Sequence, residues 1–263
     1  MRTDPLLGVV APELGWVPTP RFLLRRDRIM RLLADPSLGR LVEVGCGGGS
    51  LLHELAQRSE HATGIETSER ARALASSIAK AGRGKQRIVA GPDPEWNQDR
   101  ELVCAFDVLE HIEHDGAALE EWAGWLMKGG RLCMSVPAHQ RRWGAGDEWA
   151  GHWRRYGRHD LQALLVSKGF VIEHIECYGF PLGNLTEWYG ERFYRRALRD
   201  RQGNLNKSQA TSESGVERNY YVRKFKWLDS APARALLRFF NITQSLASRT
   251  DWGTGYLVLA RKE

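Results

Sequence analysis

The chain has 263 residues, which is long enough for one full hydrophobic core with an inserted segment. Hydrophobic residues make up 42% of it, yet no apolar run approaches the roughly 18 residues that a membrane-spanning helix needs. The composition therefore predicts a globular protein and excludes a spanning helix. The first residues lack a basic stretch followed by an apolar one, so we expect no secretory signal and a cytoplasmic location.

The formal net charge of +6 favours anionic partners: a phosphorylated or carboxylated metabolite, nucleic acid, or an anionic membrane surface. Four cysteines, at 46, 104, 133 and 177, lie far apart and form no Cys-x-x-Cys pair. The spacing predicts reduced thiols and no metal site.

Strands and helices alternate from about residue 40 to residue 177, which is typical of βαβ units and a mostly parallel sheet. An arginine-rich amphipathic helix over 20–33 precedes them. Strands are predicted at 41–44, 62–66, 87–90, 102–106, 131–136 and 170–177. Helices are predicted over 50–58, with a serine cap, and from a cap at 67–69 through residue 81. Two more are predicted over 116–127 and 160–167.

About seventy residues of different character then separate the sixth strand from a last strand over 255–260. Within this insertion we expect a helix over 185–199, a polar mobile loop over 200–219 and a second helix over 232–240. The fold class predicted is α/β, with seven strands, helices on both faces and a helical insertion before the last strand.

The stretch from Glu43 to Gly49 places glycines at a junction of strand and helix. Glycine allows a sharp turn there and lets a ligand lie against the backbone, although a glycine-rich turn without a ligand is the alternative. A dinucleotide fingerprint would need a third glycine where Ser50 stands, and Glu43 does not suit a pyrophosphate.

This acid-x-Gly-x-Gly-x-Gly stretch resembles the motif of class I S-adenosylmethionine-dependent methyltransferases. A second segment, Phe106-Asp107-Val108-Leu109-Glu110-His111-Ile112, resembles the Val-Leu-Glu-His segment of their small-molecule branch, which includes the ubiquinone-biosynthesis methyltransferases. The likeness covers most of residues 20–177. It implies a Rossmann-like fold with a cofactor-binding core over 37–177 and a final strand over 251–263, an N-terminal helical cover over 1–36, and a substrate or lid insertion over 178–250.

The resemblance implies S-adenosylmethionine as cofactor. Glu66 would accept both ribose hydroxyls, which suits a carboxylate just past the second strand, the alternative being a solvated acid at a helix start. Asp93 is the candidate for the adenine amine, and Arg25 for the cofactor's carboxylate, although Arg21, Arg26 and Arg28 could replace it. The full set of predicted cofactor-binding residues is Arg25, Glu43, Gly45, Cys46, Gly47, Gly49, Glu66, Thr67, Asp93, Phe106, Asp107 and His111.

A third block, from His139 to Tyr156, follows the fifth strand at the sheet edge where ligands bind. Its tryptophans, arginines and histidines suit a flat or anionic acceptor, and a packed structural lid is the alternative. Histidine can take a proton near neutral pH. We therefore predict His139 or His152 as general base, with Tyr156 as an orienting hydroxyl.

The leading hypothesis is methyl transfer to a small or medium-sized acceptor, at oxygen rather than nitrogen or carbon. The acceptor could be anionic, aromatic or lipid-linked, and in the last case the helix over 185–199 would rest on an anionic membrane as a lid. A nicotinamide-dependent oxidoreductase is a second hypothesis. A non-catalytic nucleic-acid-binding or assembly factor is a third, disfavoured because no Asn/Asp-Pro-Pro-aromatic motif follows the fourth strand. The oligomeric state stays open.

Overall fold

A seven-stranded sheet forms the centre of the computed structural model, which describes residues 1–94, 96–200 and 219–263. Its strand order is β5-β4-β3-β6-β7-β9-β8, and β9 alone runs against its neighbours β7 and β8. The strands are β3 (Arg40–Val44), β4 (His61–Ile65), β5 (Arg87–Val89), β6 (Arg100–Phe106), β7 (Leu126–Pro137), β8 (Phe170–Tyr178) and β9 (Gly255–Lys262). The predicted α/β class and mostly parallel sheet are confirmed.

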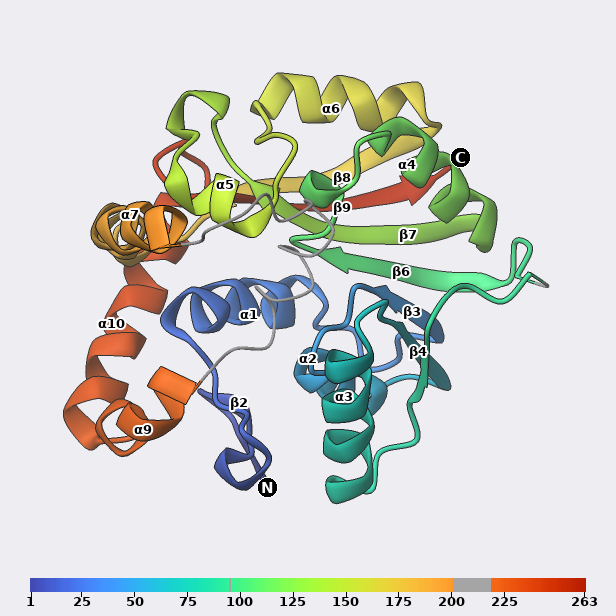
Figure 1. Cartoon of the computed structure of the whole chain (residues 1–263). Coiled ribbons are helices and arrows are strands. Elements are labelled where there is room, and N and C mark those ends of the chain that lie inside the picture. The colour runs from blue at the N-terminus through green and yellow to red at the C-terminus, as the bar shows by residue number, and fades with distance from the viewer. Residues whose placement is uncertain (95, 201–218) are drawn as a thin grey trace.

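Helices cover both faces of this sheet (Figure 1). On one face lie α1 (Pro20–Leu32), α2 (Ser50–Ala56) and α3 (Glu69–Ala81), and on the other α4 (Asp115–Trp125) and α6 (Arg158–Ser167). Two apolar clusters fill the layers between helices and strands. Parallel strands are buried on both faces in this way, which is why the strand sequences are continuously apolar rather than alternating.

Two local expectations were wrong. The predicted serine cap is absent, because Gly49, with a φ of 70°, is the N-cap of α2 and Ser50 is already helical. The helix predicted to reach residue 127 ends at Trp125, because Leu126 is already in β7 and pairs with Arg100 of β6. The cap of α3 is as expected, since Ser68 accepts the backbone N–H of Ala71 at 3.4 Å.

The N-terminus adds elements that the sequence pattern did not predict. A hairpin of β1 (Arg2–Asp4) and β2 (Gly8–Val10) precedes α1. Helix α1 is then anchored to the core by buried ion pairs, Arg26 with Glu54 of α2 and Arg28 with Glu176 of β8. The helix thus joins the hairpin to α2 and to the edge strand β8.

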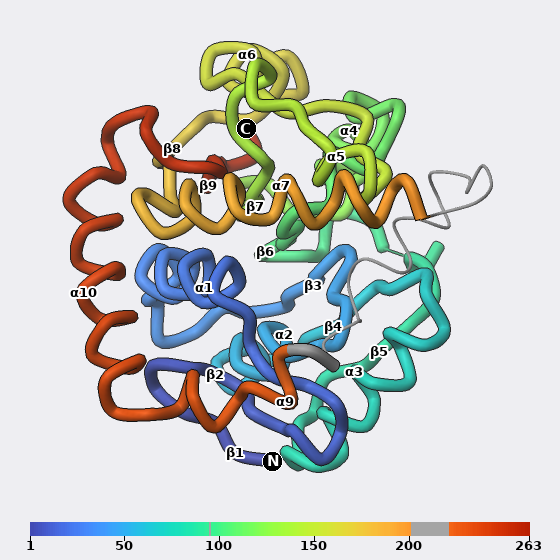
Figure 2. The backbone as a smooth tube through the Cα atoms, turned by 60° about the vertical axis from the view of Figure 1, so that its left-hand side comes forward, coloured from blue at the N-terminus to red at the C-terminus, as the bar shows by residue number. Residues whose placement is uncertain are grey.

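Among the described residues, the helices that follow β8 lie with α1 along one side of the molecule (Figure 2): α7 (Leu182–Asp200), α9 (Asn219–Leu228) and α10 (Ala231–Ala247). The predicted helices over 185–199 and 232–240 are present but longer, and α9 and the short α5 (Ala145–Ala150) were missed. The predicted polar loop lies outside the described residues except at Asp200 and Asn219, which are helical. None of the described helices is long and apolar enough to cross a membrane.

We predict that replacing Arg26 destabilises the fold strongly. Its Nε lies 2.8 Å from Oε1 of Glu54, and both side chains are almost fully buried. Arg26→Met leaves that carboxylate uncompensated, so urea unfolding should show a loss of about 3–5 kcal/mol. The double variant Arg26→Met/Glu54→Leu should recover most of it.

Arg31→Met is the matched control, because Arg31 forms an exposed ion pair with Asp27 on the same helix. Its effect should stay below about 1 kcal/mol. Equal losses of unfolding free energy in Arg26→Met and Arg31→Met would contradict a stabilising role for the buried Arg26–Glu54 ion pair.

Candidate active site

The strands β3, β4 and β6 end at one edge of the sheet, and the predicted glycine loop lies there. Gly45, Gly47 and Gly49 all have positive φ. A Cβ on Gly49 would lie 2.8 Å from that of Ala75 in α3, whereas a Cβ on Gly47 would meet nothing within 4 Å. One side of the loop is therefore packed on α3, and the surface above Gly47 is open to a ligand.

Glu66 lies against this open loop and does not extend into solvent. Its Oε2 accepts the Gly47 N–H at 2.9 Å, and its Oε1 accepts the Ser68 N–H at 2.8 Å. Thr67 beside it is exposed, and the backbone carbonyl of Asp93 accepts the Trp96 N–H in the turn after β5. A carboxylate that already accepts two N–H groups at a glycine loop is placed to accept two hydroxyls from a ligand.

An open apolar cleft of about 370 Å³ lies beside these residues. Val44 and Ile65 at the ends of β3 and β4 form one wall, Pro92 a second, and Ile112 and Trp122 a third. Such walls suit a flat aromatic ring.

Asp107, the first residue after β6, is the most densely bonded group at this edge. Its Oδ1 accepts the Ser135 hydroxyl at 2.8 Å and that of Tyr178 at 3.4 Å, and its Oδ2 forms ion pairs with Arg25 and, at 3.5 Å, Arg21. Burial alone would raise the pKa of Asp107, but the two arginines and the serine hold it down at about 2. The carboxylate is ionised, and it brings both arginines of α1 to the sheet edge where the glycine loop lies.

The Glu43 carboxyl, unlike that of Asp107, lacks partners that would hold it ionised. Its side chain is buried in β3, and Oε2 has no hydrogen-bond partner among the described residues. Burial, with a smaller contribution from Glu66 against the attraction of Arg25, raises its pKa to about 8. With this pKa the carboxyl holds its proton at pH 7 in the ligand-free protein, and a cation brought beside it would favour loss of that proton.

Cys46 and Phe106 contribute differently from the charged residues. The side chains of both are buried in the apolar cluster on the α1–α3 face. Burial raises the pKa of the Cys46 thiol, so it stays protonated. Cys46 offers only its backbone to the loop.

A second polar cluster joins the turn after β6 to the segment after β7. The His111 and His152 rings meet edge to face with centroids 4.6 Å apart. Glu110 lies beside them, fully buried, and neither of its carboxylate oxygens has a hydrogen-bond partner in the described part of the chain. Donor atoms of these three residues lie within 4.8 Å of one another. Two imidazoles and a carboxylate could hold a proton or a divalent metal ion, a grouping that the sequence did not predict.

Asp147 in α5 orients His152. Its Oδ1 lies 2.8 Å from Nδ1 of His152, and both its oxygens accept the Nε–H of Arg155. Burial opposes ionisation, but the hydrogen bonds from His152 and Arg155 lower the pKa of Asp147 to about 2. An ionised acceptor at Nδ1 favours the tautomer with its proton there, which leaves Nε2 free to take a proton. Burial, together with the charge of His152, lowers the pKa of His111 to about 4.

The other two predicted catalytic residues lie elsewhere. The Tyr156 hydroxyl is buried and donates to Oδ2 of Asp115 at 3.0 Å, so the expectation that it orients an acceptor is corrected. His139 follows β7 and lies against Tyr256 of β9, with ring centroids 5.5 Å apart. Burial and Arg142 lower its pKa, and its buried Nε2 has no hydrogen-bond partner in the residues described.

Helix α7 lies across α5, although not with its apolar face. Glu187 pairs with Arg142 and Arg155, and Glu191 accepts the backbone N–H of Ala145 at 3.1 Å. The acidic side of α7 is thus turned inward. Its aromatic and aliphatic residues Leu185, Trp188, Tyr189 and Phe193 are exposed, contrary to a helix packed by its apolar face.

We predict that Glu43→Gln stabilises the ligand-free protein in a pH-dependent way. Because the folded pKa is raised to about 8, stability is lost as pH rises from the unfolded pKa, near 4.5, through 8. The variant's advantage should be absent at pH 4 and reach on the order of 4 kcal/mol above pH 8. Urea unfolding across this range measures it. An advantage that is equal at both ends would contradict the assignment.

Comparison with known proteins identifies the family of the chain. Residues 20–175 match the family model described as a methyltransferase domain. The chain is 29% identical over 133 residues to a ubiquinone biosynthesis O-methyltransferase of Marinobacter nauticus, covering 46% of this chain and 56% of the relative. It is 28% identical over 118 residues to a trans-aconitate 2-methyltransferase of Streptomyces avermitilis, covering 43% of each. The chain thus spans about half the length of these curated relatives.

Solved structures share the fold at low identity. An S-adenosylmethionine-dependent methyltransferase from Mesorhizobium loti superposes with a TM-score of 0.54 at 16% identity, covering 93% of this chain and 98% of that one. The cyclase SpnF superposes with a TM-score of 0.57 at 19% identity, covering 99% and 87%. The fold therefore accommodates more than one chemistry, whereas the family model matches more than half of the sequence. The chain belongs to the methyltransferase domain family.

Proposed function

We propose that this protein transfers a methyl group from S-adenosylmethionine to an oxygen atom of a small acceptor. One observation carries the proposal: the sheet edge places Glu66 against the open Gly47 loop and, across Asp107, a His152 ring oriented by Asp147. The first pair forms a site for a ribose, and the second a site for proton transfer. Asp107 lies within electrostatic reach of both Arg25 and His152.

The cofactor site is assigned from the geometry of its polar groups. Glu66 would accept the ribose hydroxyls, and the cleft beside Asp93 would take the adenine. Arg25 would meet the carboxylate at the methionine end, and the unpartnered Glu43 its ammonium group. Bound there, S-adenosylmethionine would supply an electrophilic methyl group on its positively charged sulfur, for attack in line by the acceptor oxygen with S-adenosylhomocysteine as the leaving group.

The residues of this chain then have to orient the acceptor, exclude water and take its proton. In the proposal, Nε2 of His152 accepts the proton of the acceptor hydroxyl, and Asp147 stabilises the imidazolium through Nδ1. His111 is a weaker base, because its pKa is about 4. His139 is the second candidate.

The acceptor is proposed to enter between the N-terminal cover, residues 1–36, and the segment 178–250. Arg21 supports an acceptor that carries an anionic group. Its guanidinium lies at the edge of the site, and nearly half of the side chain is exposed. The name of the Marinobacter relative supports oxygen as the methylated atom. Contacts of α7 with Arg142 through Glu187, and with Ala145 of α5 through Glu191, support a lid role for that helix.

We predict that Glu66→Gln weakens binding of S-adenosylhomocysteine at least about tenfold, because one charged acceptor is lost. Gly47→Val should do the same by filling the open space above the loop. Calorimetry measures both, and Glu60→Gln, at an exposed site before the opposite end of β4, is the control and should bind as the parent does. Unchanged affinity in both site variants, or binding of NAD in place of S-adenosylhomocysteine, would reject the cofactor assignment.

We predict that His152→Gln lowers kcat by on the order of a hundredfold while cofactor affinity is retained. Asp147→Asn should lower it less and shift the pH profile, because the imidazolium loses its counter-charge. The readout is transfer of labelled methyl groups to a cell extract, read by mass. His139→Gln is run beside it, and a full loss there with normal turnover in His152→Gln would move the base to His139. A chelator that abolishes turnover in the parent would assign His152 to a metal instead.

A further inference from the structure

Helix α10 leaves large apolar side chains exposed while it buries polar ones. A surface helix normally buries its apolar residues and exposes its polar ones. Here the buried face mixes Leu237 and small residues with Asn241 and Gln244, whereas Leu236, Phe239, Ile242 and Leu246 are exposed. We name these four exposed residues the α10 apolar stripe.

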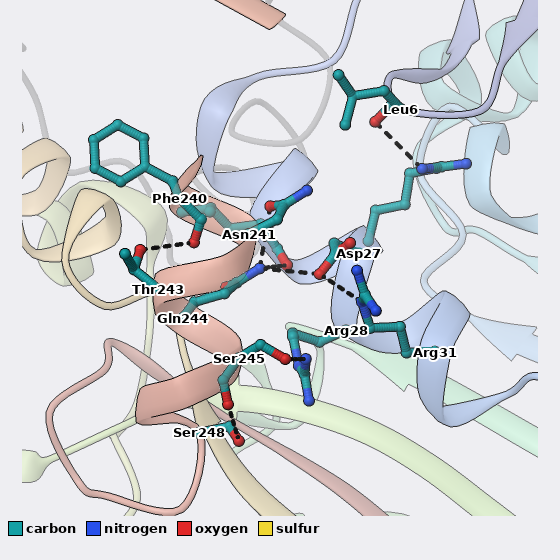
Figure 3. A network of polar contacts seen from close by, with 12 residues as sticks. Leu6, Asp27, Arg28, Arg31, Phe240, Asn241, Thr243, Gln244, Ser245 and Ser248 are labelled. Carbon is teal, nitrogen blue, oxygen red and sulfur yellow. Dashed lines mark hydrogen bonds and ion pairs between the residues drawn. The ribbon is translucent and has the colours of Figure 1, made fainter. Parts of the chain in front are cut away.

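The inward face is held by polar contacts, of which Figure 3 shows those of Gln244 with Asp27 and of Ser245 with Arg28 of α1. The Gln244 side-chain amide also donates to the Leu24 carbonyl at 3.0 Å, and its oxygen accepts the N–H of Gly179, which follows β8, at 3.2 Å. The Ser245 hydroxyl accepts from Arg28 at 2.6 Å. These contacts determine which way the helix faces, so rotation of α10 could not bury the stripe without breaking them.

The stripe is exposed over the whole length of the helix. The exposed fractions are 50% for Leu236, 56% for Phe239, 60% for Ile242 and 81% for Leu246. Spacings of three and four residues put them on one side of the helix. Trp252, between α10 and β9, is also 61% exposed, and its carbonyl accepts the Asn184 side chain at the start of α7. A row of exposed apolar side chains of this kind marks an interaction site.

Cations border this stripe. Arg238 lies beside it on the helix, Arg249 follows the C-terminal end of α10, and both side chains are exposed. Neither forms an ion pair or hydrogen bond within residues 1–94, 96–200 and 219–263, whereas Arg234 on the same helix is paired with Asp4 and Asp229. The net charge of the chain is +6. An apolar row flanked by unpaired arginines and a tryptophan is the composition of helices that lie in the headgroup region of a bilayer.

We propose that the α10 apolar stripe rests on an anionic lipid bilayer, with Arg238 and Arg249 at the headgroups. A second copy of the chain fits less well, because a symmetric contact through the stripe would bring like charges together. Four partly exposed side chains also offer less than the about 800 Å² per partner that stable interfaces bury. The proposal does not depend on methyl transfer.

The test is flotation of the full chain with vesicles of phosphatidylcholine alone and of equimolar phosphatidylcholine and phosphatidylglycerol. The parent should float with the anionic vesicles and much less with the neutral ones. Phe239→Ser/Leu246→Ser should lower partitioning about tenfold or more. Arg238→Gln and Arg249→Gln should each lower it about fivefold, with anionic vesicles only. The matched control is Val166→Ser, 61% exposed on α6 across the sheet (Figure 1), and it should bind as the parent does.

All variants are first checked for unchanged thermal unfolding and S-adenosylhomocysteine binding. If the double variant unfolds at a lower temperature than the parent, Leu246→Ser alone, at the most exposed position, replaces it. Absence of parent binding to both vesicle types would overturn the proposal. Equal binding by the stripe variants and the parent would do so as well. A dimer in buffer that Leu246→Ser dissociates would replace the bilayer with a second copy.

Discussion

Burying the carboxylate of Asp107 at the end of β6 requires compensating positive charge, and that charge comes from another part of the chain. Arg25 and Arg21 reach it from α1, and the Ser135 and Tyr178 hydroxyls reach it from β7 and β8. A buried charge without such partners would be costly. The ion pair thereby couples the placement of α1 to the geometry of the sheet edge where the cofactor is proposed to bind.

The same logic governs the second carboxylate of the site. Asp147 is buried in α5 and is satisfied by Arg155 and His152 together, so an imidazole that would otherwise rotate freely is held in one orientation. Glu43 and Glu110 are the contrasting cases, since each has buried carboxylate oxygens without a partner among the described residues. A buried polar group without a hydrogen-bond partner destabilises the folded protein relative to one that is paired. Their position beside the paired carboxylates indicates where a bound ligand would supply the missing hydrogen-bond partner.

Helix α1 links the active edge to α10. Its arginines at 21 and 25 face Asp107, while Leu24 and Arg28 bind the polar face of α10. Because that polar face is directed inward, the apolar stripe has to face outward, and a bilayer beneath it would lie on the side of the molecule that α7 and α10 share (Figure 2). Contact with a membrane and access of an acceptor would then be neighbouring events at one side of the fold.

The sequence by itself determined the alternation of strands and helices, the glycine loop and the acid that follows the second strand, because these depend on local periodicity and on backbone positions that glycine alone tolerates well. Tertiary structure decided the rest. It joined His152 to His111 across forty residues, withdrew Tyr156 to Asp115 and turned the acidic side of α7 inward. It also decided the orientation of α10, because helical periodicity reveals two faces of a helix but not which one meets the core. Pairing of buried charges and amides between distant segments made that choice, and such pairing leaves no periodic trace in the chain.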